Sequence, residues 1–374
     1  MRFIHLGDLH IGKRVNDFLL LKDQEYVFEQ IYDIIKNEKI EAVLIAGDVY
    51  DKQVPSLEAV TLFDKFLTKM SELMVKVYII SGNHDSPERL SFAGKLLEKS
   101  NVYVSHMYDG KVQKQVLEDE YGEINIYMLP FIKPIHVKKY YPDEEINDYN
   151  QAVKRVIKDI DIDIDNRNLI MSHQFVTGAS ICDSEELSIG GLENIDGSIF
   201  DDFDYVALGH IHGAQKVGRE TLRYSGTPLK YSFSEINHKK SVTIVDVKEK
   251  GNIDIQLIEL KPLHNMRKIE GTYKEITLKD NYISTDTTDY MHIVLKDEED
   301  IVDAIGKLRS IYPNIMKLEY DNTRTRTSSQ IDVDNKINEK TPLELFETLF
   351  ELQNNQKMTD EQTEYMREIM DNMD

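Results

Sequence analysis

The stretch Ser81-Gly82-Asn83-His84-Asp85 follows an apolar run, Val75 to Ile80, that only Lys76 interrupts. The run predicts a buried β-strand, and Gly82 allows the chain to turn sharply where the strand ends. An amide, an imidazole and a carboxylate then occupy three successive positions. Because polar groups at the end of a buried strand are costly unless they bind something, this stretch predicts a binding site at one edge of a sheet.

Other segments supply similar side chains, each directly after a predicted strand. They are Asp8-Leu9-His10, Gly47-Asp48, His173 and Gly209-His210-Ile211-His212. Side chains alternate along an extended chain, so the two polar residues of an i, i+2 pair face the same way and can hold one ion. Open α/β sheets place their sites at the carboxyl ends of their strands. We therefore expect these segments to meet in one site.

The combined side chains predict a centre of two metal ions. Imidazole, carboxylate and amide groups without a thiolate suit manganese, iron(II) or zinc better than calcium. The set is too large for one ion, whereas two ions that share a bridging carboxylate can use all of it. Such pairs of ions catalyse in-line displacement at phosphorus. The predicted ligands are Asp8, His10, Asp48, Asn83, His173, His210 and His212.

The first half of the chain alternates strands and helices. Apolar runs at 3–6, 42–46 and 77–80 predict strands, and the segments 24–36 and 56–74 carry apolar residues at helical spacing. This β-α-β-α-β order predicts an α/β layer with a partly parallel sheet. The later predicted strands indicate a second sheet packed on the first, so we predict a four-layer α/β/β/α sandwich. These later strands are 102–104, 124–129, 169–171, 205–208, 222–225, 242–247 and 253–260.

Smaller parts are predicted after the sandwich. A strand at 290–295, a helix at 299–311 and a strand at 315–320 form a compact β-α-β unit with none of the candidate ligands. A polar stretch then reads as a linker. The predicted domains are 1–262 for the catalytic sandwich, 263–325 for a small α+β domain, 326–340 for the linker and 341–374 for a helical hairpin.

The predicted hairpin is acidic and has two capping boxes, which begin at Thr341 and Thr359. A hairpin this small cannot bury the apolar stripes of both helices within itself. It therefore docks either on its own chain or on a partner, and we favour a partner because Met and Phe are adaptable anchors.

The composition excludes several classes of protein. No apolar run approaches the ~18 residues of a membrane span, and the amino terminus lacks the pattern of a signal peptide. The single cysteine, Cys182, cannot form a disulfide scaffold, so a reducing cytoplasm is the expected location. The formal net charge of −22 argues against a free, non-specific binder of nucleic acid. It is compatible with a nuclease whose metals or partner neutralise the substrate.

Taken together, the motifs around the predicted ligands resemble those of the calcineurin-like metallophosphoesterases. The resemblance is carried by Asp8-x-His10, Gly47-Asp48, Gly82-Asn83-His84-Asp85, His173 and Gly209-His210-x-His212. Residues 1 to about 245 are also similar to the SbcD family, the nuclease subunits of bacterial SbcCD complexes. That similarity lies in Ser86-Pro87-Glu88-Arg89-Leu90, Gly209-His210-Ile211-His212-Gly213, Tyr224-Ser225-Gly226-Thr227-Pro228 and Tyr231-Ser232-Phe233.

This resemblance implies a role for each residue of the site. One manganese ion would be held by Asp8, His10 and His212, the other by Asn83, His173 and His210, and Asp48 would bridge the two. His84 would not be a ligand but would stabilise the charge on phosphorus or protonate the leaving oxygen. We expect Asp51 to orient His84, with Asp85 as the competing candidate.

The resemblance also implies a function. The expected enzyme is a manganese-dependent DNA nuclease, a double-strand exonuclease and single-strand or hairpin endonuclease, in which a metal-bound hydroxide attacks the phosphodiester. It would act in DNA repair, replication and recombination under the control of an SbcC-type coiled-coil ABC ATPase. The β-α-β unit would cap DNA, and the hairpin would bind the ATPase. The helix at 56–74 and the segment 90–98 are candidates for a homodimer face, and Lys13, Arg14 and Arg89 for DNA contacts.

Two alternatives remain at the level of sequence. A phosphoesterase for small molecules or phosphoproteins could use the same fold, but it would not need the extra domain or the hairpin. A non-catalytic scaffold for the ATPase could use the hairpin, but it would not need the complete set of ligands and His84.

Overall fold

The computed structural model describes residues 1–185, 193–323, 325, 342–354 and 357–371. The chain divides into two compact units, Met1–Asn265 and Met266–Asp374. All of the predicted ligands belong to the first unit. The predicted linker and the predicted cap at Thr341 lie outside the described residues.

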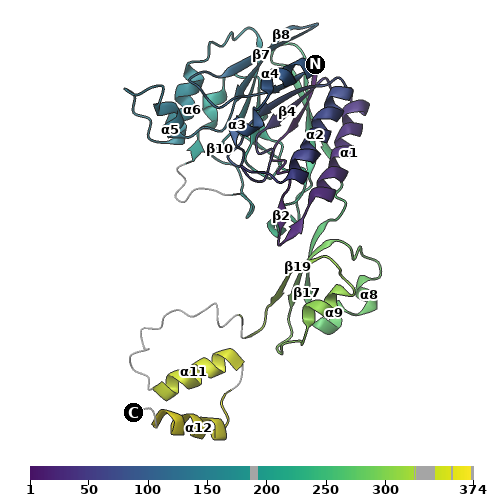
Figure 1. The fold of residues 1–374 in the computed structure, drawn as a ribbon, viewed down its shortest axis with the longest axis vertical. Helices are drawn as coiled ribbons and strands as arrows, with labels where there is room; N and C mark the ends of the chain where they lie inside the picture. Colours follow the sequence, from purple (N-terminus) through teal and green to yellow (C-terminus); the bar gives the residue numbers. More distant parts are fainter. Residues whose placement is uncertain (186–192, 324, 326–341, 355–356, 372–374) are drawn as a thin grey trace. The chain divides into compact units, whose positions relative to one another are not determined.

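Two six-stranded sheets form the centre of the first unit (Figure 1). The first sheet has the order β16-β15-β1-β4-β5-β6, and its last four strands run parallel. The second has the order β13-β14-β12-β9-β8-β7, and its four central strands run parallel. The strands of the first sheet are β1 (Arg2–Leu6), β4 (Ala42–Ala46), β5 (Lys76–Ile80), β6 (Val102–Val104), β15 (Ser241–Val247) and β16 (Ile253–Glu259). Those of the second are β7 (Gln113–Asp119), β8 (Gly122–Leu129), β9 (Arg167–His173), β12 (Tyr205–Gly209), β13 (Gln215–Val217) and β14 (Arg219–Tyr224).

The central strands are apolar at consecutive positions because both of their faces are buried. In β8, Ile126 and Met128 join the core between the two sheets, whereas Tyr127 and Leu129 join the core on the outer face. The inner core also contains Leu44 of the first sheet. Alternation of side chains along each strand thus fills two separate apolar layers.

Helices cover the outer faces of both sheets. On the first sheet, α1 (Leu21–Asn37) and α2 (Leu57–Glu72) lie side by side, with the Phe28 and Phe66 rings 4.9 Å apart (Figure 1). On the second, α5 (Pro134–Lys138) and α6 (Tyr149–Lys158) add apolar residues to the outer core. The predicted four-layer sandwich is therefore confirmed. None of the helices in the described parts of the chain is long and apolar enough to cross a membrane.

The structure corrects the assignment of strands to sheets. The predicted strands at 102–104, 242–247 and 253–260 extend the first sheet and not the second, because β6 pairs with β5 and β15 pairs with β1. Local periodicity carries no information on pairing between distant segments. The sequence patterns also missed β7, which is polar at most positions, and α6.

The second unit contains a small α+β domain with three parallel strands, one more than predicted. They are β17 (Met266–Gly271), β18 (Tyr290–Leu295) and β19 (Ile315–Tyr320), with the short helices α7 (Tyr273–Ile276), α8 (Lys279–Tyr282) and α9 (Ala304–Arg309). Three charged residues among its six positions hid β17 from the apolar pattern. The predicted helix at 299–311 is shorter because Asp303, just before α9, has a left-handed backbone with φ of 51°.

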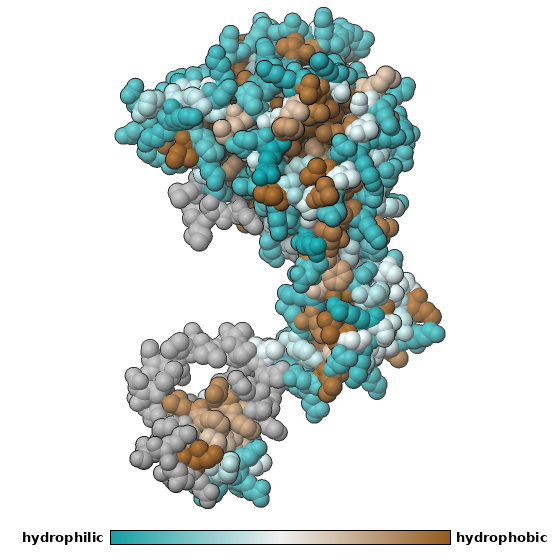
Figure 2. Space-filling model, in the orientation of Figure 1, coloured by the Kyte–Doolittle hydropathy of each residue, from teal (hydrophilic) through white to brown (hydrophobic). Residues whose placement is uncertain are grey.

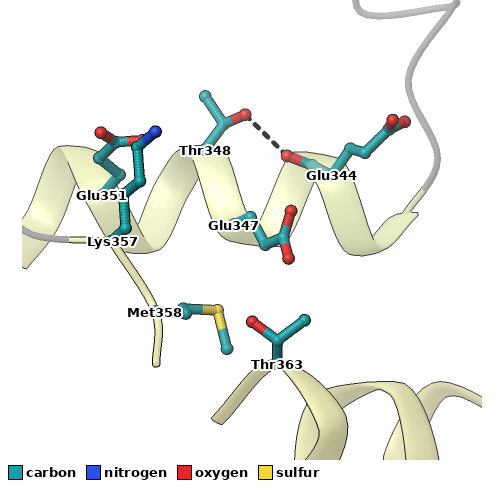
Figure 3. A pocket seen from close by; sticks show the side chains of 7 residues that line it. All are labelled: Glu344, Glu347, Thr348, Glu351, Lys357, Met358 and Thr363. Atoms are coloured by element: carbon teal, nitrogen blue, oxygen red, sulfur yellow. Dashed lines mark hydrogen bonds between the residues drawn. The ribbon is translucent and has the colours of Figure 1, made fainter. Parts of the chain in front are cut away.

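The two predicted C-terminal helices are present as α11 (Pro342–Asn354) and α12 (Asp360–Asp371). The capping box at Thr359 is formed, because the Gln362 amide donates to Thr359 Oγ1 at 3.3 Å and the Thr359 amide donates to Gln362 Oε1 at 2.9 Å. Figure 3 shows Glu344, Glu347 and Glu351 on α11, with Glu347 on the side of Met358 and Thr363. These three glutamates and Lys357 are the charged residues that line this pocket of the hairpin.

Candidate metal centre

The strand ends of both sheets bring the predicted ligands together. Asp8, Asp48 and Asn83 follow β1, β4 and β5 of the first sheet, and His173 ends β9 of the second. His210 and His212 follow β12. Hydrogen bonds join the two sheets here: His173 Nδ1 donates to the Ala46 carbonyl at 2.8 Å. The site therefore lies where the carboxyl ends of the parallel strands in both sheets meet.

The motif glycines are required because the backbone segments approach closely at these turns. A Cβ atom on Gly82 would collide with the Asp48 carboxylate. A Cβ atom on Gly209 would collide with the Ala46 carbonyl. The glycines before Asn83 and before His210 therefore allow the two sheets to close around the site.

Several ligand positions have a strained backbone. Asp8, His10, Asp48 and His210 have φ angles of 53°, 43°, 49° and 102°, a region that residues with a side chain rarely adopt. Such strain costs of order 1–3 kcal/mol per residue and persists only where the surrounding structure imposes it. Its concentration at the predicted ligands supports a functional role for these turns.

One group of side chains consists of Asp8, His10 and His212. The Nε2 atoms of His10 and His212 lie 3.2 Å apart. Asp8 Oδ1 accepts from the His210 amide at 2.8 Å, whereas its Oδ2 is buried and has no hydrogen-bond partner among the described residues. The three residues offer ligand atoms within 4.8 Å of one another.

A second group consists of Asn83, His173 and His210. Asn83 Oδ1 lies 2.9 Å from His173 Nε2 and 3.0 Å from His210 Nδ1. Because His173 donates its Nδ1–H to the Ala46 carbonyl, Nε2 is the nitrogen that faces the centre, as a metal-ligating histidine requires. Apart from Asn83, which is half-buried, the predicted ligands are at most 5% exposed.

Asp48 lies between the two groups. Its Oδ2 is 3.6 Å from His10 Nε2 and 3.4 Å from His173 Nε2. Its Oδ1 accepts from the His84 amide at 2.9 Å. A single carboxylate thus reaches both groups, which is the arrangement of a bridging ligand.

The electrostatics of the centre favour neutral imidazoles beside a positive charge. Burial lowers the pKa of His10 and of His212 well below the ordinary value, so both rings are neutral. Burial opposes the charge on Asp48, but the nearby His173 holds the pKa of Asp48 far below its usual range. Although burial opposes this too, Asp48 raises the pKa of His173 to about 9. The Asp48 carboxylate therefore stabilises a positive charge between the two groups of ligands.

The residues present fit divalent metal ions. Two neutral imidazole nitrogens 3.2 Å apart would repel through their lone pairs, unless a proton or a cation lies between them. Two ligand nitrogens bound at about 2.1 Å with a right angle at the ion would be about 3.0 Å apart. The buried, unpaired Asp8 Oδ2 adds an acceptor at the same place. Nitrogen and oxygen donors without thiolate are the set that the sequence predicted.

The structure brings Asp51 to His84 through the main chain. His84 Nδ1 lies 3.2 Å from the Asp51 carbonyl oxygen, whereas the Asp51 carboxylate pairs with Lys13 at 2.8 Å. The competing Asp85 accepts from the amides of Val49, Tyr50 and Gly82 at 3.1, 3.0 and 2.9 Å and so holds the two loops together. His84 also offers a nitrogen within 4.8 Å of ligand atoms of His10 and Asp48.

Sequence reasoning missed the residues that support the ligands from behind. Ser184, Glu185 and Glu235 contact His212, directly or through one another. Gln24 of α1 donates to the His10 carbonyl at 2.8 Å. Glu235 follows the quoted Tyr231-Ser232-Phe233 motif by two residues, but nothing in the sequence indicated that this carboxylate would be buried beside the site.

Comparison with known proteins gives family matches for most of the chain. Residues 1–214 match the family described as calcineurin-like phosphoesterase, and residues 262–354 match the SbcD C-terminal family, described as type 5 capsule protein repressor C-terminal domain. The SbcD protein of the SbcCD nuclease from Staphylococcus epidermidis is 34% identical over 324 residues, which are 85% of each chain.

Two solved structures are similar at 12% identity. GAP50, described as the anchor in the inner membrane complex of Plasmodium, covers 85% of this chain and 96% of its own, with a TM-score of 0.44. A dimetal phosphatase from Danio rerio covers 70% of this chain and 99% of its own, with a TM-score of 0.43.

Proposed function

Because the chain belongs to the SbcD family of calcineurin-like phosphoesterases, we propose that it is a manganese-dependent nuclease that cuts DNA ends and hairpins. Membership of this family makes the chain a metal-dependent hydrolase of the nuclease type. In particular, we propose that it has double-strand exonuclease activity and single-strand or hairpin endonuclease activity. The observation that supports it most is the single oxygen, Asp48 Oδ2, that lies within 3.6 Å of an imidazole in each group.

We propose that Asp8, His10 and His212 hold one ion, that Asn83, His173 and His210 hold the other, and that Asp48 bridges them. When bound, the ions supply Lewis-acid activation of water and neutralise the phosphate oxygens. Nitrogen and carboxylate ligands make Mn²⁺ the proposed metal.

His84 acts on the substrate in this proposal. Its Nδ1 hydrogen bond to the Asp51 carbonyl fixes the ring, so Nε2 is free to face the scissile phosphodiester. A protonated His84 would keep that bond and donate from Nε2 to the leaving oxygen. The side chain is half-buried, whereas the predicted ligands His10 and Asp48 near it are buried, which suits contact with a substrate.

Cleavage of an end-labelled DNA hairpin with Mn²⁺ tests the proposal. We expect wild-type cutting that a chelator abolishes and that His84→Gln lowers by about 10²- to 10⁴-fold, the usual contribution of a general acid. His106→Gln is the matched control, because His106 is exposed and its ring contacts the neighbouring Met107 carbonyl. Absence of cutting, even with an SbcC-type ATPase and ATP, would contradict the proposal. Hydrolysis of an aryl phosphodiester alone would then favour a small-molecule phosphoesterase.

We also propose that the chain forms a homodimer through α2 and the segment of α3 (Pro87–Leu90) and α4 (Gly94–Leu97). Leu57 of α2 is 77% exposed, and Phe92 and Leu96 of the second segment are 80% and 66% exposed, so both elements carry apolar side chains open to a partner. Figure 2 shows hydrophobic side chains among the hydrophilic surface where α2 lies. Sedimentation of wild type and of Phe92→Asp measures the oligomeric state directly. A wild-type monomer at micromolar concentration would refute the dimer.

The proposed partner of the α11–α12 hairpin is a coiled-coil ABC ATPase of the SbcC type. Leu349 and Tyr365 are 50% and 65% exposed in the hairpin, which leaves an apolar surface for a partner helix. Deletion of residues 342–371 should abolish co-purification with such an ATPase while hydrolysis of an aryl phosphodiester continues. Retained binding would assign the contact to another surface.

A further inference from the structure

A cluster of buried and half-buried polar side chains lies behind His212, away from the other ligands. Ser184 Oγ is 2.7 Å from His212 Nδ1 and 2.7 Å from Glu235 Oε1. Glu235 is completely buried and pairs with Lys240, which is also buried. These residues come from two loops, around 184 and around 235, that follow different strands.

The donors and acceptors in this cluster can be assigned. Glu235 is paired with an ammonium group, so its carboxylate is an acceptor, and the Ser184 hydroxyl hydrogen must point to it. Ser184 Oγ can then only accept from His212, which places the imidazole hydrogen on Nδ1. The Nε2 lone pair of His212 therefore points toward His10 Nε2, 3.2 Å away.

The same cluster also holds the main chain of His212. Its amide donates to Glu185 Oε1 at 2.7 Å, and its carbonyl accepts from Lys240 Nζ at 2.8 Å and from the Thr227 amide at 3.1 Å. Every polar atom of His212 except Nε2 thus has a partner in the cluster. Nε2 is therefore the atom of His212 that remains available to bind an ion.

We infer that Ser184 and Glu235 are positioning residues that fix the ring orientation and tautomer of His212 for metal binding. The inference rests on the proposed role of His212 as a ligand. Partners behind a metal-bound histidine are known to tune affinity, and their loss costs about 10- to 100-fold in metal affinity. Lys240 keeps Glu235 charged. We call this chain of contacts the relay: it runs from Lys240 through Glu235 and Ser184 to His212, which would bind the ion.

Calorimetric titration of the full chain with Mn²⁺ tests the inference. We expect Ser184→Ala to weaken one of the two Mn²⁺ sites by about 10- to 100-fold, in a metal-free protein that still unfolds cooperatively. Ser184→Thr keeps the hydroxyl and should restore affinity. Ser232→Ala is the matched control, because Ser232 Oγ donates to the same Glu235 oxygen at 3.2 Å and otherwise contacts Ser234 Oγ, without reaching His212. Equal affinities for wild type and Ser184→Ala would overturn the inference.

A second readout is independent of metal and of catalysis. Nitrogen-15 spectra of histidine-labelled, metal-free protein report the tautomer of His212, assigned by its disappearance in His212→Gln. We expect the Nδ1–H form in wild type and in Ser232→Ala, and a mixture of tautomers in Ser184→Ala. Glu235→Gln, combined with Lys240→Met to avoid an unpaired buried charge, should also give a mixture. A single unchanged tautomer in all variants would overturn the inference.

These measurements separate the inference from the proposed function. Wild-type protein that binds Mn²⁺ in a Ser184-dependent way but does not cut DNA would contradict the nuclease and support the relay. Protein that cuts DNA equally well with and without the Ser184 hydroxyl, at limiting Mn²⁺, would support the nuclease and overturn the relay.

Discussion

His84 is held by a main-chain atom, and this decides how the acidic residues near it respond to substitution. Asp51→Asn removes the ion pair with Lys13 but keeps the carbonyl that contacts His84 Nδ1. We therefore expect turnover of a phosphodiester to fall less than about tenfold, against about 10²- to 10⁴-fold for His84→Gln. Steady-state kinetics with saturating Mn²⁺ measures both. A loss in Asp51→Asn as large as in His84→Gln would show that the carboxylate itself is required.

At this scale the sequence predicted the side chains that converge and not the contacts behind them. Asp8, Asp48, His173 and His210 were found because each follows an apolar run, a local signal. Ser184 and Glu235 escaped because they act through a fold that joins distant loops, and a serine or glutamate in a polar loop has no distinctive pattern. The same holds for the carbonyl of Asp51, since main-chain groups leave no trace in a sequence.

Helix α1 supports the first ligand loop through one side chain. Gln24 is 1% exposed, donates to the carbonyls of Leu9 and His10 at 3.2 and 2.8 Å, and accepts from the Gly12 amide at 3.0 Å. Gln24→Ala leaves the Gly12 amide without this partner and removes one donor each from the Leu9 and His10 carbonyls, which keep the Tyr231 hydroxyl and the Lys13 amide. The loss should lower the free energy of unfolding by about 1–3 kcal/mol. Urea unfolding with excess chelator measures the change without a contribution from metal.

Gln30→Ala is the control for Gln24 on the same helix. Gln30 bonds the Lys261 main chain at an exposed position, so its loss lets water replace the contacts. We expect a change within about 0.5 kcal/mol, as for most surface substitutions. Equal effects of the two substitutions would mean that the loop at residues 9–12 does not depend on α1.

At the level of elements, a strong apolar pattern was sufficient to predict a strand, whereas strands with a weak apolar pattern were missed. β4, β18 and β19 have the predicted bounds. In β4 and β18, which lie inside their sheets, an apolar run gives the strand a clear start and end. The polar edge strand β7 was missed, since only one face of an edge strand needs to be apolar. The sheet to which β15 and β16 belong depends on pairing with β1, which no local pattern encodes.

In the first unit, a buried arginine ties the two sheets together at the end opposite the metal centre. Arg167, 2% exposed at the start of β9, donates to both Asp119 carboxylate oxygens at 3.1 and 2.6 Å and to the Lys248 carbonyl at 2.9 Å. The amino group of Met1 contacts the same carboxylate at 3.0 Å. The clamp thus joins the beginnings of β1 and β9, while the ends of these strands carry Asp8 and His173.

This clamp should make the stability of the whole unit depend on Asp119 and on pH. Burial alone would raise the pKa of Asp119, but hydrogen bonds from Arg167, from the Tyr121 amide and from Met1 hold that pKa below its ordinary value. A depressed pKa means that the unfolded chain takes up the proton first. The stabilisation is therefore present above about pH 4, the ordinary value for aspartate, and is lost as the pH falls below it.

We expect Asp119→Asn to lower the free energy of unfolding at pH 7 by about 3–5 kcal/mol, because it leaves the Arg167 charge buried without its partner. The difference between wild type and variant should shrink between pH 4 and pH 3, since protonation of Asp119 in the unfolded chain then stabilises the unfolded state of wild type, and the variant has no such group. Urea unfolding of both proteins at pH 7, 4 and 3 provides the values. A difference that stays constant over this range would show that the contribution of Asp119 is packing, because only an electrostatic clamp follows the proton.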